Sequence, residues 1–137
     1  MNRFYNFFRK NTLHAGNICR SEEEFHQKLE IECKRSAYNE QAFSLLLLKM
    51  NSTRSGQEKT QKLIRKIHNR IRDIDIIGRY DTENIGVIMP YTSENGARGL
   101  LQKIMASIME LKKDVAYTIY QYFPDQDNPE KIQRKQL

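Results

Sequence analysis

The sequence has little of what marks secreted, membrane-spanning or nucleic-acid-binding proteins. Its two cysteines, Cys19 and Cys33, are too far apart for a CxxC pair and too few for a disulfide framework. No apolar run approaches the roughly 20 residues that span a bilayer, and the basic, aromatic N-terminus lacks the apolar core of a secretory signal. Long basic tracts and zinc-finger or RNA-binding signatures are also missing. We therefore expect reduced thiols in a cytoplasmic protein.

The composition is that of one globular domain. The 137 residues suffice for a single buried core, and 39% of them are hydrophobic. A formal net charge of +6 arises from 23 Lys and Arg against 17 Asp and Glu. Basic residues alternate with acidic ones, as in Glu58-Lys59 and Arg72-Asp73, which is typical of a mixed solvated surface. We therefore predict no binding to nucleic acid.

The first half of the chain predicts a helix followed by a buried strand. Ser21 is a suitable N-cap, and Glu24 three residues later fits a capping box. Apolar residues then recur at every fourth position: Phe25, Leu29 and Cys33. We expect a helix over residues 21–39 that buries this stripe. The apolar run 43–50 (FSLLLLKM) predicts a strand that is covered on both faces, at the centre of a sheet.

The second half predicts a helix, a hairpin, another helix and a last strand. The segments are a helix of about four turns whose apolar face includes residues 63–71, strands over 74–80 and 85–89, a helix from Thr92 or Ser93 to Leu111, and a strand over 115–123. The helices follow from apolar residues at helical spacing. Turn-forming residues between the strands over 74–80 and 85–89 indicate an antiparallel hairpin, and β-branched and aromatic residues indicate the last strand.

This order predicts an α+β domain in which helices flank a central mixed, largely antiparallel sheet. We place the domain at residues 21–123, after an aromatic-basic segment at 1–20 and before a polar tail at 124–137. The tail has no periodic pattern, so we expect it to be loose. The aromatic and basic residues at 1–10 are expected to pack on the domain or on a second copy. Contact with an anionic membrane surface is the alternative.

Residues 70–104 carry a pattern that resembles a known family. Arg72 and Asp75 form an R-x-x-D pair, Arg79-Tyr80 precedes a turn, and an apolar strand then ends at Pro90. This pattern is similar to the central portion of GGDEF domains, the diguanylate cyclase family. The run 43–50 occupies the place of that family's first core strand. The resemblance implies the GGDEF, nucleotidyl-cyclase-like fold, here lacking the family's last helix.

The turn departs from the family's Gly-Gly-Asp/Glu-Glu-Phe pattern. Its five positions hold Asp81, Thr82, Glu83, Asn84 and Ile85. Side chains in place of the two glycines obstruct the close approach of a nucleotide. The loop that follows residue 50 is also shorter than in active members, and it lacks the residues that hold guanine and ribose.

The metal ligands implied by the resemblance are incomplete. Glu83 keeps a carboxylate at the place of one metal-binding acid, but Lys49 stands where the partner acid is expected. A pair of Mg²⁺ ions needs oxygen ligands, and an ammonium group repels them. We therefore predict no metal cofactor and no diguanylate cyclase activity. A residual cyclase organised around Glu83 is the enzyme alternative.

Arg72, Asp75 and Lys103 are the candidate ligand-binding residues. In the family, the R-x-x-D motif forms an inhibitory site for cyclic di-GMP, so the resemblance implies this ligand. A guanidinium can bind a phosphate or the Hoogsteen edge of guanine, while a carboxylate can accept from guanine N–H groups. Lys103 is in register with an arginine that often completes that site. A structural salt bridge between Arg72 and Asp75, with Asp73 competing for the arginine, is the interpretation that we favour.

The sequence thus predicts a bacterial, catalytically inactive signalling domain that acts by recognition. One role is that of a cyclic di-GMP receptor through Arg72 and Asp75. The other is interaction with a protein partner, or formation of a homodimer, without any nucleotide ligand.

Overall fold

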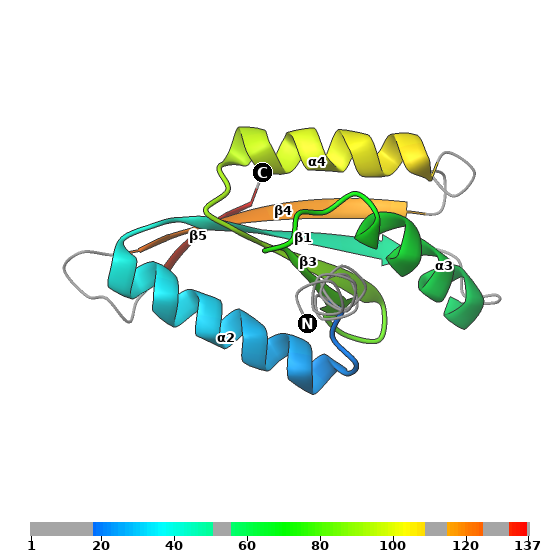
Figure 1. Cartoon of the computed structure of the whole chain (residues 1–137), viewed down its shortest axis with the longest axis horizontal. Helices are drawn as coiled ribbons and strands as arrows, with labels where there is room; N and C mark the ends of the chain where they lie inside the picture. Colours follow the sequence, from blue (N-terminus) through cyan, green and yellow to red (C-terminus); the bar gives the residue numbers. More distant parts are fainter. Residues whose placement is uncertain (1–17, 51–55, 109–114, 125–131, 137) are drawn as a thin grey trace, which may run out of the picture.

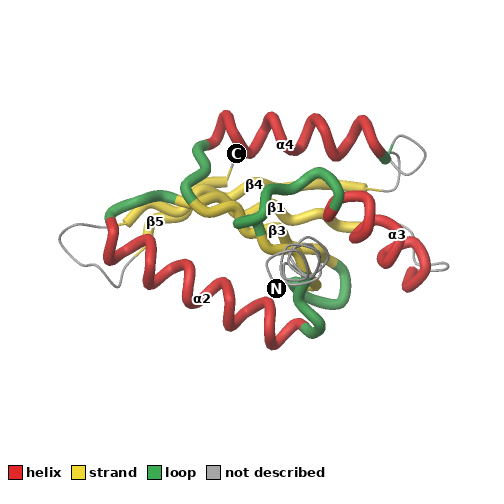
Figure 2. The backbone as a smooth tube through the Cα atoms, viewed as in Figure 1, coloured by secondary structure: helices red, strands yellow, loops and turns green. Residues whose placement is uncertain are grey.

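The computed structural model describes residues 18–50, 56–108, 115–124 and 132–136. The elements are α2 (Glu22–Asn39), β1 (Phe43–Met50), α3 (Gly56–His68), β2 (Ile76–Arg79), β3 (Asn84–Pro90), α4 (Glu94–Ser107), β4 (Val115–Pro124) and β5 (Ile132–Gln136). The strands form one sheet, with α2 on one face and α3 and α4 on the other (Figures 1 and 2). The predicted α+β architecture is confirmed.

The sheet has the strand order β2-β3-β1-β4-β5, and each of its four pairings is antiparallel. The described residues add one isolated parallel bridge, between Ile18 and Ile77 at the β2 edge. Strands β2 and β3 form the predicted antiparallel hairpin. No helix in the described part of the chain has the length and apolar character needed to cross a bilayer.

Strand β1 lies at the centre of the sheet, as its continuous apolar run predicts. It pairs with β3 on one side and with β4 on the other. Leu46 and Leu48 belong to the core under α3 and α4, whereas Phe43 and Leu45 belong to the core under α2. Successive side chains of a strand point to opposite faces, so this one strand contributes side chains to both hydrophobic cores.

Helix α2 begins and ends with local hydrogen bonds. The Ser21 side chain accepts from the backbone N–H of Glu24 at 3.0 Å. The Glu24 carboxylate accepts in turn from the Arg20 N–H at 2.8 Å, one residue before the position that a standard capping box uses. At the other end, Glu40 adopts a left-handed conformation (φ 56°), and its N–H bonds the Ser36 carbonyl.

Helix α2 packs tightly on the hairpin because two glycines face Phe25. Gly78 of β2 and Gly86 of β3 are paired in register. A Cβ atom at Gly86 would overlap the Phe25 ring, and one at Gly78 would lie 2.8 Å from the Cβ of Cys19. The absence of side chains lets the fully buried Phe25 ring lie directly against the hairpin backbone.

The C-terminal part of the chain differs from our expectation. We predicted a loose tail at residues 124–137, but Ile132–Gln136 forms β5 and pairs with β4 between Tyr120 and Pro124. Backbone hydrogen bonds along the edge of β4 stabilise such a strand without any apolar periodicity in its sequence.

Several element ends also differ from the predicted ones. Helix α3 ends at His68, so Ile71 follows the helix and packs against the core from a loop. Strand β2 begins at Ile76, two residues later than predicted. Ser93, one of the two predicted caps, is the N-cap of α4. The segment 1–10 and Leu111 lie outside the described residues.

Candidate functional site

The R-x-x-D motif forms a tight turn immediately before β2. The Arg72 backbone N–H donates to Asp75 Oδ2 at 2.8 Å, and the Asp75 N–H donates to the Arg72 carbonyl at 3.0 Å. The Arg72 side chain folds back onto the same carboxylate, with Nε 3.2 and 3.1 Å from the two oxygens and Nη2 2.8 Å from Oδ1. The two residues thus form a forked ion pair within one turn.

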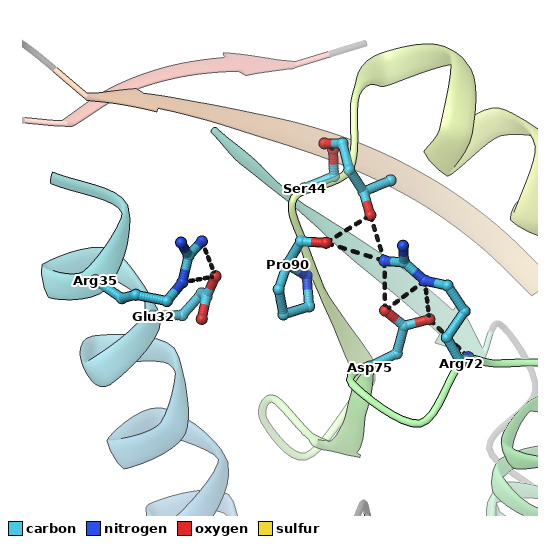
Figure 3. A network of polar contacts seen from close by, with 7 residues as sticks. Glu32, Arg35, Ser44, Arg72, Asp75 and Pro90 are labelled. Atoms are coloured by element: carbon cyan, nitrogen blue, oxygen red, sulfur yellow. Dashed lines mark hydrogen bonds and ion pairs between the residues drawn. The ribbon is translucent and has the colours of Figure 1, made fainter. Parts of the chain in front are cut away.

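The Arg72 guanidinium also binds the end of β3 and the chain just after it (Figure 3). Nη2 donates to the Pro90 carbonyl at 3.0 Å and to the Thr92 hydroxyl oxygen. That hydroxyl donates to the Pro90 carbonyl at 2.9 Å, and Ser44 of β1 donates to the Thr92 carbonyl at 2.8 Å. Arg72 therefore fixes the segment between β3 and α4 to the turn before β2.

The two members of the ion pair differ sharply in exposure. The Asp75 side chain is 1% exposed, whereas the Arg72 side chain is 50% exposed. Both carboxylate oxygens already accept from Arg72, and the described hydrogen bonds of the guanidinium use only Nε and Nη2. Asp75 therefore orients the guanidinium, and Nη1 forms no hydrogen bond among the described contacts of Arg72.

The segment held by Arg72 contains a residue in an unusual conformation. Tyr91 has a φ of 54°, in the left-handed region that side chains rarely adopt. For a bulky residue this conformation costs about 1–3 kcal/mol and persists only where neighbours hold it. Its flanking residues, Pro90 and Thr92, both accept hydrogen bonds from Arg72 Nη2.

Helix α2 contacts the Tyr91 side chain, which is 55% exposed. The Cζ atom of Arg35 lies 4.0 Å from the centroid of the Tyr91 ring, which is a cation–π contact. Arg35 is itself held by Glu32, one helical turn away, with Nε 2.8 Å from Oε2. The hydrogen bond to Glu32 raises the pKa of Arg35 above its ordinary value, although burial lowers it.

The sequence analysis did not select Arg35, Glu32 or Tyr91. The i, i+3 spacing of Glu32 and Arg35 was a visible signal for an ion pair. Nothing in the sequence signals the left-handed Tyr91, because that conformation depends on contacts with distant elements. Lys103, which was selected, is exposed on α4 and forms no described hydrogen bond or ion pair with Arg72 or Asp75.

The turn between β2 and β3 is closed by Asp81. Its Oδ1 accepts from the backbone N–H groups of Glu83 at 2.8 Å and Asn84 at 2.7 Å, and from the Asn84 side chain at 3.0 Å. Burial pushes the Asp81 pKa up, but the hydrogen bonds from Glu83 and Asn84, together with the charge of Lys49, outweigh it and lower the pKa. Thr82 is exposed and Ile85 is buried in the core.

Lys49 and Glu83 form an ion pair beside this turn. Strand register places Lys49 opposite Asn84, and its Nζ lies 3.3 Å from Glu83 Oε2. Both side chains are more than half exposed. Across the described ranges, no three His, Cys, Asp or Glu side chains gather where they could hold a metal ion. The carboxylate that a divalent cation would need therefore faces an ammonium group.

The sequence matches one family model. Residues 21–123 match the model described as diguanylate cyclase, GGDEF domain. The chain belongs to the GGDEF family. The resemblance seen in residues 70–104 is thereby confirmed. Among curated protein sequences, none matches this GGDEF domain.

Solved structures share the GGDEF fold. A DGC protein from Thermotoga maritima has a TM-score of 0.60 at 17% identity, over 73% of this chain and 77% of that one. SiaD from Pseudomonas aeruginosa, in complex with its activator SiaC, has a TM-score of 0.64 at 18% identity, over 88% of this chain and 55% of SiaD. The GGDEF domain of DgcB from Caulobacter crescentus, in complex with c-di-GMP, has a TM-score of 0.57 at 13% identity, over 78% and 72%. This chain spans little more than half of SiaD, and the likeness is one of fold.

Proposed function

We propose that this GGDEF domain is a catalytically inactive, cytoplasmic module of bacterial signalling, and that it acts by binding cyclic di-GMP. The Lys49–Glu83 ion pair is the observation that carries the inactive half of the proposal. A diguanylate cyclase of this family needs divalent cations on a triphosphate, and these cations need carboxylate oxygens. Lys49 replaces one such oxygen donor with a cation and neutralises the other.

The shape of the turn supports the same conclusion. The family's two glycines are replaced by Asp81 and Thr82. The Asp81 carboxylate is occupied by the backbone N–H groups of Glu83 and Asn84. These N–H groups are therefore not available to a phosphate, and the carboxylate is not available to a metal ion.

A reaction assay tests the inactive half. The purified domain is incubated with GTP and Mg²⁺ or Mn²⁺, and the products are separated by chromatography. We expect no cyclic dinucleotide above the background of a heated sample. Product that disappears in Glu83→Gln would overturn the proposal, because it would show a working cyclase organised around that carboxylate.

Arg72 carries the recognition half. Its guanidinium is held in one orientation by Asp75, Pro90 and Thr92, so a ligand meets a preorganised donor edge. We propose that Nη1 binds a guanine edge or a phosphate of cyclic di-GMP, that Asp75 positions the guanidinium, and that Lys103 contributes charge to a second phosphate. The DgcB structure, which holds c-di-GMP on a similar fold, supports this choice of ligand.

Calorimetry with cyclic di-GMP tests the recognition half. We expect the intact domain to bind, Arg72→Ala to lose at least tenfold in affinity, and Lys103→Ala to lose less. Arg70→Ala is the matched control, because it removes the same charge from an exposed site two residues away. Absence of heat with the intact domain, or an equal loss in both arginine variants, would reject Arg72 as the ligand site.

One observation favours the second role, interaction with a protein partner or a second copy. Ile31 is 60% exposed and Tyr38 is 88% exposed, and both lie on the outer face of α2, two turns apart. SiaD, of similar fold, was solved with a protein activator. If calorimetry shows no nucleotide binding, loss of self-association in Ile31→Lys, measured by sedimentation, would support a homodimer through this face.

A further inference from the structure

A chain of contacts links the Arg72 site to helix α2. Arg35 of α2 contacts the Tyr91 ring, and Tyr91 lies between Pro90 and Thr92, which both accept from Arg72. The two guanidinium groups share no described bond, and Figure 3 shows Pro90 between them. The segment of residues 90–92 is therefore what joins the two arginines.

The joining segment is strained at Tyr91, and the contact with Arg35 can stabilise that strained conformation. The left-handed backbone of Tyr91 aims the Pro90 carbonyl and the Thr92 hydroxyl at the same atom, Arg72 Nη2. A tyrosine that lost its ring contact would tend to leave this conformation, since an extended backbone is less costly for it. Pro90 and Thr92 would then turn away from Arg72, and the guanidinium would lose two of its acceptors.

We propose that Tyr91, held under Arg35, is a positioning residue of the Arg72 site. It fixes the acceptors of Nη2 and so keeps the Nη1 edge pointed at the ligand. The proposal rests on the proposed function for its ligand, cyclic di-GMP. It adds a regulatory property: a conformational change in the C-terminal half of α2 alters the affinity for ligand at Arg72. By reciprocity, ligand bound at Arg72 shifts the equilibrium of that change by the same factor.

A double-mutant cycle tests the link without any ligand. Arg35→Met, Arg72→Met and the double variant are unfolded in urea, and their unfolding equilibrium constants are compared with that of the intact domain. The cost of leaving Glu32 without its arginine occurs in both Arg35 variants and cancels in the cycle. We expect the unfolding equilibrium constant of the double variant to differ by about threefold or more from the value that the two single variants predict together. Agreement with that value within about twofold would overturn the proposal.

A second measurement reads the site itself. Calorimetry with cyclic di-GMP compares Tyr91→Ala, Tyr91→Phe and Arg35→Met with the control Lys34→Met, which changes the neighbouring cation of α2. We expect three- to tenfold weaker binding for Tyr91→Ala and Arg35→Met, and near-normal binding for Tyr91→Phe, which keeps the ring. Unchanged affinity in Tyr91→Ala, in a protein where Arg72→Ala abolishes binding, would overturn the positioning role while the proposed function stands.

The two arms separate the two possible failures. If the intact domain binds no cyclic di-GMP, the proposed function fails, and the cycle alone decides whether Arg35 and Arg72 are coupled. The resonance of the Arg72 Nη2–H group, which donates to Pro90 and Thr92, gives an independent signature: Tyr91→Ala shifts it when these acceptors move, and Lys34→Met leaves it in place. An unshifted resonance in Tyr91→Ala counts against the proposal.

Discussion

Single residues decide what the hairpin end of the sheet can bind. Lys49 places a cation 3.3 Å from Glu83, and both side chains lie more than half in solvent. An exposed pair of this kind contributes only about 0–1 kcal/mol to stability. Its main effect is to cancel the charge of Glu83. A neighbouring carboxylate, Asp81, is used within the turn itself, where it accepts from Glu83 and Asn84.

Asp81 should make stability depend on pH on the acid side. Its pKa is lowered in the folded protein, so the folded state binds fewer protons than the unfolded state just below the ordinary pKa of 3.8. The stabilisation is therefore present above about pH 4 and is lost as pH falls through the lowered pKa. The free energy of unfolding, measured in urea from neutral to acid pH, should lose this part of its pH dependence in Asp81→Asn. Thr82→Ala, on the same turn, should keep it, and identical profiles for the two variants would contradict the assignment.

Cys19 should be slow to react in the folded protein. Burial, with a smaller effect from Glu24, raises the pKa of the Cys19 thiol to about 11, so little thiolate exists near neutral pH. In a Cys33→Ser background, iodoacetamide at pH 8 should label the native protein far more slowly than the protein in urea. Equal rates in the two conditions would show that this side chain is not buried in the folded protein.

At the scale of elements, α2 is fixed by one ring against two glycines. Phe25 lies on Gly78 and Gly86, with no room for a side chain at Gly86. This contact sets how closely α2 approaches β2 and β3. It also fixes the path of α2 toward its C-terminal half, where Arg35 meets Tyr91.

Gly86→Ala should therefore destabilise the fold. The added methyl group overlaps Phe25, and overpacking of this kind costs about 1–3 kcal/mol. The change is measured as the shift in the urea midpoint. Gly99→Ala is a control of opposite sign, because no atom lies within 4 Å of the new methyl group and alanine favours the helix by about 0.5–1 kcal/mol. A destabilised Gly99→Ala together with a neutral Gly86→Ala would contradict this packing.

The sequence predicts these elements well where the signal is local. The run 43–50 specifies β1, and Ser21 with Glu24 specifies the start of α2, because burial and capping act on neighbouring residues. The ion pair of Arg72 and Asp75 was also predictable from its spacing. The contacts of Arg72 with Pro90 and Thr92 were not, since they join segments 18 to 20 residues apart through backbone geometry.

At the scale of the whole molecule, the sheet ends at two edges, β2 and β5. Strand β5 has no apolar periodicity in its sequence, and it pairs with the stretch of β4 between Tyr120 and Pro124. This is why the sequence predicted a loose tail there. A strand that depends on its neighbour for order cannot be recognised from its own residues.

Removal of residues 125–137 should expose the edge of β4. We expect a lower urea midpoint and concentration-dependent self-association, because an unpaired edge strand is a template for another chain. Light scattering and urea unfolding measure the two effects. A protein that lacks Leu137 alone keeps β5 and serves as the control. If the shortened domain stays monomeric with an unchanged midpoint, β5 contributes nothing to the sheet.

The central position of β1 constrains when the domain can fold during synthesis. Phe43 pairs with Pro90 on one side and with Tyr122 on the other. Its second neighbour leaves the ribosome only after most of the chain has been made, so the most apolar strand waits half-paired through much of translation. A nascent chain stalled before Val115 should consequently be bound by chaperones and cleaved by proteases, while one stalled well beyond Pro124 should resist both.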